Sequence, residues 1–168
     1  MTRPKVTIDT SLGVMIFELY PEAAPATAAN FLKLVRKGFY GETADYVCYF
    51  YRVIPGFVAQ GGPLGDHDEQ VNSAPIKGEF GPILHERGVL SMCRSEDPDS
   101  ASCQFFICLG KLAKLNGQYA SFGRLIAGED VLRQIEQAET TDGLDGAKSR
   151  PVEPILILRV EEMVRDSK

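Results

Sequence analysis

Short apolar runs, each about the length of one β-strand, follow one another along most of this 168-residue sequence. Near the start, Val6 and Ile8 alternate with polar Thr7 and Asp9, the period-two pattern of a strand that buries one face. Glycine and proline separate the successive runs and favour turns between them. Further runs of this kind cover residues 13–20, 49–54, 57–60, 88–93, 104–109, 121–126 and 155–160. The first two runs are close enough in sequence to form a hairpin.

Two segments carry their apolar residues at helical spacing instead. In residues 25–37, Phe31 and Val35 fall on one face, a proline suits the first turn, and Gly38 suits the position just after the last turn. A second amphipathic helix is predicted over residues 129–138. About eight strands and two helices indicate a β-barrel or a β-sandwich with helices covering its ends. The sequence shows no internal repeat and no linker, so we expect one domain over residues 1–168.

Composition and charge exclude several classes of function. The net charge of −5 and the scattered lysines and arginines argue against a nucleic-acid binder, which needs clustered positive charge. No apolar run is long enough to span a membrane, and residues 1–12 lack the apolar stretch of a signal peptide, so we expect a cytoplasmic protein.

The cysteines and histidines show no spacing typical of a metal site. The four cysteines form no C-x-x-C pair, and His67 and His85 lie far apart, so we expect no metal and no cofactor. The thiols are predicted to be reduced and mostly buried, with Cys48 and Cys93 the more accessible ones.

One arginine stands out because it interrupts an apolar, aromatic strand. Arg52 cannot lose its charge, so it must face the surface, form an ion pair or point into a functional cleft. Val58 and Gln60 share one face of the next predicted strand, and Gln104 and Phe106 share one face of another. An amide beside an apolar group on each strand suits a cleft that holds peptide backbone next to an apolar ring.

Four sequence blocks make a more specific interpretation possible. FYRVIPGFVAQGG at residues 50–62 resembles the cyclophilin signature F-H-R-[VI]-I-P-G-F-x-x-Q-G-G. HERGVLSM at 85–92, CQFFIC at 103–108 and LNGQY at 115–119 resemble further cyclophilin blocks, in the family's order. The resemblance implies an eight-stranded antiparallel β-barrel capped by two α-helices. It also implies a peptidyl-prolyl cis/trans isomerase that acts on proline-containing peptides and unfolded proteins and assists folding. Nothing in the sequence suggests more than a monomer, so we expect a monomer.

The same resemblance implies the site residues, position by position. Arg52 corresponds to the catalytic arginine. The residues that correspond to the substrate groove are Phe57, Val58, Gln60, Cys93, Arg94, Gln104, Phe106, Leu115 and Tyr119.

The sequence departs from the family pattern at several of these places. Tyr51 replaces the usual histidine beside the arginine, Cys93 replaces alanine and Arg94 replaces asparagine. Lys114 stands where many members have a tryptophan that donates a hydrogen bond to cyclosporin, so we expect weakened cyclosporin affinity with catalysis retained. Residues 41–47 lengthen one connection, which we expect to lie near the groove.

Two other functions compete with an active isomerase. The first is a proline-segment binding or scaffold module with weak or no catalysis, against which the intact Arg52, Phe57, Gln60 and Phe106 argue. The second is a hydrolase, for which the sequence offers no G-x-S-x-G or S-x-x-K motif and no plausible Cys-His pair.

Overall fold

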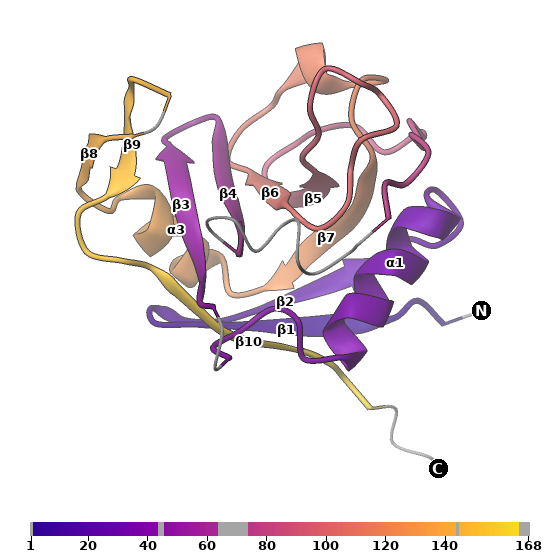
Figure 1. Cartoon of the computed structure of the whole chain (residues 1–168), viewed down its shortest axis with the longest axis horizontal. Coiled ribbons are helices and arrows are strands. Elements are labelled where there is room, and N and C mark those ends of the chain that lie inside the picture. The colour runs from indigo at the N-terminus through magenta and orange to yellow at the C-terminus, as the bar shows by residue number, and fades with distance from the viewer. Residues whose placement is uncertain (1, 44–45, 64–73, 144, 165–168) are drawn as a thin grey trace.

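Eight antiparallel strands close into a barrel in this computed structural model, which describes residues 2–43, 46–63, 74–143 and 145–164 (Figure 1). Around the barrel the strands follow the order β1-β10-β3-β4-β6-β5-β7-β2. Their bounds are β1 (Lys5–Thr10), β2 (Gly13–Leu19), β3 (Cys48–Ile54), β4 (Val58–Pro63), β5 (Val89–Met92), β6 (Phe105–Cys108), β7 (Ser121–Ala127) and β10 (Leu156–Glu162). The predicted barrel and its N-terminal hairpin are confirmed.

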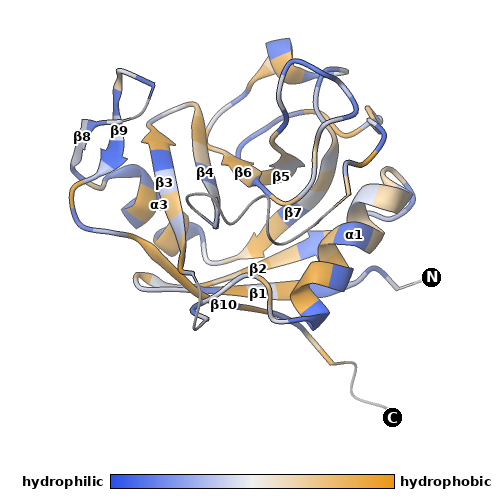
Figure 2. Cartoon of the chain, viewed as in Figure 1, coloured by the Kyte–Doolittle hydropathy of each residue, from blue (hydrophilic) through white to orange (hydrophobic). Residues whose placement is uncertain are grey.

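The described residues include the two predicted α-helices, α1 (Pro25–Arg36) and α3 (Glu129–Glu136), and one short 3₁₀ turn, η1 (Ala113–Leu115). Helix α1 has its proline in the first turn and ends before Gly38, whose φ of +68° is a conformation that glycine adopts at little cost. Its buried face includes Phe31 and Val35, as the spacing predicts, and both hydrophobic and hydrophilic residues follow one another along its ribbon (Figure 2).

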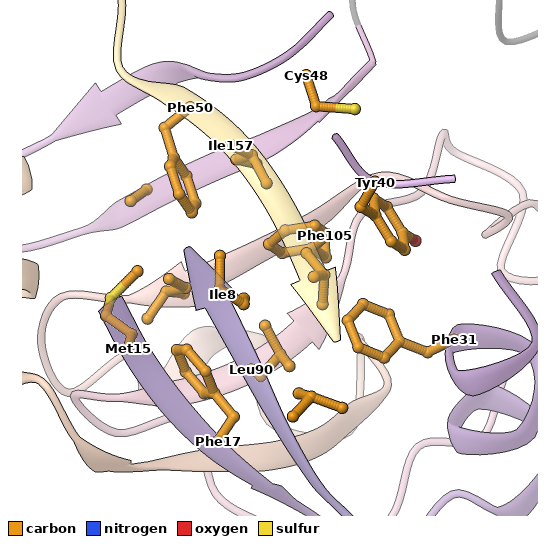
Figure 3. Close-up of a cluster of buried hydrophobic side chains, with 14 of the residues drawn as sticks. Ile8, Met15, Phe17, Phe31, Tyr40, Cys48, Phe50, Leu90, Phe105 and Ile157 are labelled. Atoms are coloured by element: carbon orange, nitrogen blue, oxygen red, sulfur yellow. The ribbon is translucent and has the colours of Figure 1, made fainter. Parts of the chain in front are cut away.

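The barrel interior forms the main hydrophobic core (Figure 3). Strand β6 shows which side chains enter the core, because successive side chains of a strand point to opposite faces of the sheet. Phe105 and Ile107 point inward and are fully buried, whereas Phe106 and Cys108 belong to a separate cluster on the outside of the barrel. Tyr40 reaches the core from the segment after α1, and its buried hydroxyl donates to the Cys103 carbonyl at 2.7 Å.

A small second sheet follows α3, in a stretch that the glycines and proline predicted to be a loop. Strands β8 (Thr140–Asp142) and β9 (Lys148–Pro151) pair with each other only, and β9 lies against β3 (Figure 1). These strands have three and four residues and mostly exposed side chains, so they lack the alternation that identifies longer strands.

Two further expectations are wrong. Cys48 was expected to be accessible, but its side chain is fully buried in the core (Figure 3). The connection at residues 41–47 was expected near the groove, but Gly41 pairs with Arg159 of β10, and the Tyr46 hydroxyl donates to the Phe39 carbonyl at 2.6 Å. The described part of this connection therefore packs against β10 and the core.

Candidate active site

A cavity of about 180 Å³ lies on the outer face of the barrel, and nine of the ten predicted site residues line it. They come from β3, the β3–β4 turn, β4, β6 and the segments that follow β5 and precede β7. The nine residues are Arg52, Phe57, Val58, Gln60, Cys93, Arg94, Phe106, Leu115 and Tyr119. The fold therefore brings together side chains that span 68 positions of sequence, from 52 to 119.

The register between β4 and β6 explains why these side chains share one face. Gln60 is paired with Phe106, and Val58 is paired with Cys108, so all four point to the same side of the sheet. Their neighbours along the strands point into the barrel. The two-residue spacing that predicted a shared face for Val58 and Gln60 is confirmed by this register.

A β-bulge in β3 places Arg52 on that same face. Phe50 pairs with Gly61 and Arg52 pairs with Gln60. Tyr51 is therefore an extra residue in β3 that has no paired residue in β4. Phe50 and Val53 both lie in the core, three positions apart, which leaves both residues between them directed outward. The bulge thus puts Tyr51 and Arg52 side by side, where a regular strand would send one of them into the barrel.

The floor of the cavity is apolar, and we call it the outer cluster. It consists of the buried Val58, Val89, Phe106 and Cys108, with Phe57, Ile83, Cys93, Leu112, Leu115 and Tyr119 packed against them. The Tyr119 ring meets the Phe106 ring edge-on at 5.7 Å between centroids. The turn η1 presents Leu115 to this cluster, while Lys114 beside it is exposed.

His85 supports the outer cluster from behind. Its ring stacks on Phe106 at 6.1 Å, and its two ring nitrogens contact the Ser91 hydroxyl at 2.9 Å and the Asn116 amide oxygen at 3.1 Å. The side chain is buried, and burial lowers its pKa, although the hydrogen bond to Asn116 acts in the opposite direction. His85 is therefore a neutral, hydrogen-bonded support behind Phe106.

Gln104, the tenth predicted residue, does not line the cavity but is joined to it by hydrogen bonds. Its Nε2 donates to the Pro63 carbonyl at 2.6 Å, and its Oε1 accepts from the Tyr51 hydroxyl at 2.7 Å. The Tyr51 oxygen accepts in turn from Gln60 Nε2 at 2.7 Å. A carbonyl can only accept, so Pro63 fixes the direction of the whole chain. Gly62 makes room for it, because a Cβ there would overlap the Gln104 amide.

The Arg52 guanidinium is held by an acid that the sequence analysis missed. Arg52 Nε donates to Asp145 Oδ2 at 2.9 Å, and the guanidinium carbon lies 5.9 Å from the centre of the Phe57 ring. The ion pair and two further donors lower the pKa of Asp145 to about 2. No local pattern links this residue to the site, because it lies 93 positions from Arg52 in a glycine-containing turn.

Arg94 forms one wall of the cavity through its side chain. Its guanidinium lies over the Tyr119 ring at 4.7 Å and near the Phe80 ring at 5.8 Å. Its nitrogens also donate to backbone carbonyls of Gln118 and Ser95 at 2.9 and 2.8 Å. The replacement of the family's asparagine therefore adds a fixed positive charge beside the pocket.

The cysteines near the site are thiols at neutral pH. Burial raises the pKa of Cys93 far above its usual value and that of Cys108 to about 12. Within the described ranges, no three Cys, His, Asp or Glu side chains gather as metal ligands, and no helix there is long and apolar enough to cross a membrane.

Known proteins resemble this chain in both sequence and structure. The family model "Cyclophilin type peptidyl-prolyl cis-trans isomerase/CLD" matches residues 5–162. A peptidyl-prolyl cis-trans isomerase of Acinetobacter baylyi is 38% identical over 164 residues, which cover 93% of this chain and 84% of the relative. An Arabidopsis thaliana enzyme of the same name is 36% identical over 92% of this chain and 69% of its own length.

Solved structures give the same result. The crystal structure of a Cryptosporidium parvum cyclophilin type isomerase superposes with a TM-score of 0.81 at 28% identity, covering 97% of this chain and 99% of the other. A second structure of that protein, solved in the presence of the dipeptide Ala-Pro, gives a TM-score of 0.80 at 29% identity, covering 96% and 99% of the two chains.

Proposed function

This chain belongs to the cyclophilin-type peptidyl-prolyl cis-trans isomerase family, and we propose that it catalyses rotation about X-Pro peptide bonds in the cavity beside Arg52. The observation that carries this proposal is that the Arg52 guanidinium and an apolar floor meet around a single cavity. Arg52 is the proposed catalytic residue. The other eight lining residues and the adjoining Gln104 are the proposed substrate-binding groove.

The chemistry of the reaction explains why so few groups suffice. The two isomers of an X-Pro bond have similar free energies, and amide resonance separates them by a barrier of roughly 18–20 kcal/mol. In the twisted transition state the resonance is lost and the proline nitrogen becomes pyramidal with a lone pair. A donor near that nitrogen, or near the prolyl carbonyl, stabilises the twisted amide more than either planar form.

The apolar floor has the second role in this mechanism. The ring of the substrate proline would pack on Phe106, Leu115 and Phe57, which holds one side of the bond while the other side rotates. Exclusion of water there removes a solvent that stabilises charge separation in the planar amide. Gln60 would hold the substrate backbone through its side-chain amide, which the Tyr51 hydroxyl keeps in place.

Replacing Arg52 with alanine tests the proposal directly. Loss of one transition-state donor should lower kcat/KM by roughly a hundredfold to a thousandfold, measured in a protease-coupled assay with a proline peptide. Thermal unfolding should stay close to that of the wild type. Arg36→Ala is the matched control, because Arg36 forms a surface ion pair with Glu162 on α1 and β10, away from the cavity.

The same assay separates an enzyme from a binding module. A protein that only binds proline segments would leave the slow phase of the assay unchanged at every protein concentration. An Arg52→Ala variant as fast as the wild type would overturn the catalytic role given to Arg52.

The proposal extends to substrates, inhibition and location. The substrates are proline-containing peptides and unfolded proteins, so refolding that is limited by proline isomerisation should become faster in the presence of this protein. Cyclosporin should bind weakly, because Lys114 offers an ammonium group on an exposed turn instead of an indole N–H. A monomeric state and a cytoplasmic location stay predictions, which sedimentation and localisation of a tagged protein would test.

A further inference from the structure

The small sheet formed by β8 and β9 brings a carboxylate to the catalytic groove. Strand β9 lies against β3, next to the bulge that directs Arg52 outward (Figure 1). Between β8 and β9, Asp145 Oδ2 accepts from Arg52 Nε at 2.9 Å. Both side chains are about one-third exposed, so the pair lies at the rim of the cavity and not in the core.

Asp145 is itself held firmly within its turn. Its second oxygen, Oδ1, accepts from the Ser149 hydroxyl at 2.8 Å and from the Ala147 backbone N–H at 3.1 Å. The turn is closed by a hydrogen bond from the Gly143 N–H to the Ala147 carbonyl at 2.8 Å. Both carboxylate oxygens therefore have fixed donors, and the low pKa of Asp145 keeps the group ionised at neutral pH.

The ion pair restrains the guanidinium but leaves its two terminal nitrogens available as hydrogen-bond donors. Only Nε of Arg52 is bonded to Asp145, and the described residues give Nη1 and Nη2 no hydrogen-bond partner. A guanidinium held at Nε on one side and facing the Phe57 ring has a defined plane. Its two terminal nitrogens are then the donors left for the substrate.

We propose that Asp145 is a positioning residue that orients Arg52 for catalysis from the β8–β9 turn. This inference rests on the proposed isomerase function. A long, flexible arginine would otherwise have to be ordered as the transition state forms, and small errors in the placement of a donor are costly in rate. An exposed ion pair contributes little to stability, so Asp145 acts on turnover and not on folding.

Substitution of Asp145 tests this role. Asp145→Ala should lower kcat by about tenfold with little change in KM, because the restraint acts on the transition state and not on substrate affinity. Asp145→Glu, which keeps the charge, should recover part of the rate. Asp142→Ala is the matched control: Asp142 is an exposed acid on β8, three residues earlier, and its rate should equal that of the wild type.

Two further measurements separate an effect of Asp145 on the orientation of Arg52 from a general disturbance of the structure. In an Arg52→Ala background, Asp145→Ala should add no further loss, because the group that it orients is gone. In the substrate-free protein, the Arg52 Nε–H resonance should be resolved from those of exposed arginines and should move toward them in Asp145→Ala but not in Asp142→Ala.

The outcomes distinguish this inference from the proposed function. An inactive wild type would overturn the isomerase proposal and the role of Asp145 with it. An active wild type whose rate is unchanged or increased by Asp145→Ala would overturn the positioning role alone. An additive loss in the Arg52→Ala background would do the same.

Discussion

The barrel interior and the outer cluster are built from the same strands, yet they differ in what surrounds them. In β6, Phe105 points into the barrel, where the rings of Phe31, Tyr40 and Phe50 pack around it. The next residue, Phe106, points outward and meets His85 and Tyr119 on one side and the cavity on the other. Both side chains are buried, but only the second one borders space that a substrate could fill.

The difference shows that strand alternation separates stability from function in this molecule. Inward residues of β4 and β6, such as Ala59 and Ile107, are buried in the apolar core. Outward residues of the same strands lie beside Arg52, Gln60 and the Tyr51 hydroxyl. Adjacent residues on one strand can therefore be changed to affect the two properties separately.

The largest expected effect comes from the pair of neighbouring phenylalanines. Phe105→Ala should lower the free energy of unfolding by about 3–5 kcal/mol, because it leaves a closed cavity in the core. Phe106→Ala should cost less stability, because its site opens to the existing cavity, and should lower kcat/KM by tenfold or more. Urea unfolding and the coupled isomerase assay measure the two effects. Equal losses of stability in Phe105→Ala and Phe106→Ala would contradict the proposed difference between the barrel interior and the outer cluster.

Lys114→Trp, at the rim of the outer cluster, should change ligand binding without changing the stability that the barrel interior provides. An indole N–H and its ring on η1 should tighten cyclosporin inhibition by roughly tenfold, about 1.4 kcal/mol, with turnover nearly unchanged. Lys111→Trp, at an exposed lysine three residues earlier, is the control and should have no such effect. Wild-type inhibition already at nanomolar concentration would contradict the expectation.

The polar chain across the groove should give a smaller effect. Tyr51→Phe removes the hydroxyl that joins Gln60 to Gln104, and both of its hydrogen bonds are lost. The bond that holds the Gln60 amide in place is worth about 1 kcal/mol, so kcat/KM should fall by roughly fivefold. The barrel interior is untouched, so the unfolding transition should hardly move. Tyr49→Phe, two residues earlier on β3, serves as control, because the hydrogen bonds with Gln60 and Gln104 are made by the Tyr51 hydroxyl. A kcat/KM equal to that of the wild type would show that the Tyr51 hydroxyl does not contribute to catalysis.

The smallest effect concerns pH. The pKa of His85 is lowered in the folded protein because burial disfavours its charged form, so the unfolded chain binds the proton more readily. The stability from this residue is present above its unfolded pKa of about 6.5 and is lost as the pH falls through the folded value. The melting temperature should therefore drop on acidification, and His85→Gln should flatten that slope. An identical slope in the variant would show that other groups cause the drop.

Sequence patterns anticipated the parts of the fold that depend on local regularity. Alternating residues predicted the β1–β2 hairpin, and helical spacing between Pro25 and Gly38 predicted α1, because burial of one face dictates each pattern. The motif resemblance pointed to the residues that line the cavity around Arg52. For the roles of those residues the sequence supplies only the resemblance.

Other features depend on contacts that no local pattern records. The bulge at Tyr51 adds one residue to β3 without altering its apolar character, so alternation alone would have turned Tyr51 or Arg52 inward. The β8–β9 sheet is too short and too polar to show a period. Asp145 reaches Arg52 only because that sheet lies against β3, and Cys48 is buried only because β3 pairs there with β10.

Closure of the barrel has a consequence for how a client chain is released. Each barrel strand has a hydrogen-bonded neighbour on both sides, although β10 and β3 pair through only two residues each, so the barrel leaves little strand edge to which an extended peptide could add by main-chain pairing. A bound segment would be held by a few side chains along a short stretch of the peptide instead of by a continuous ladder of main-chain hydrogen bonds. Such binding would leave few bonds to break when the peptide departs, which suits a catalyst that must release its product after each turnover.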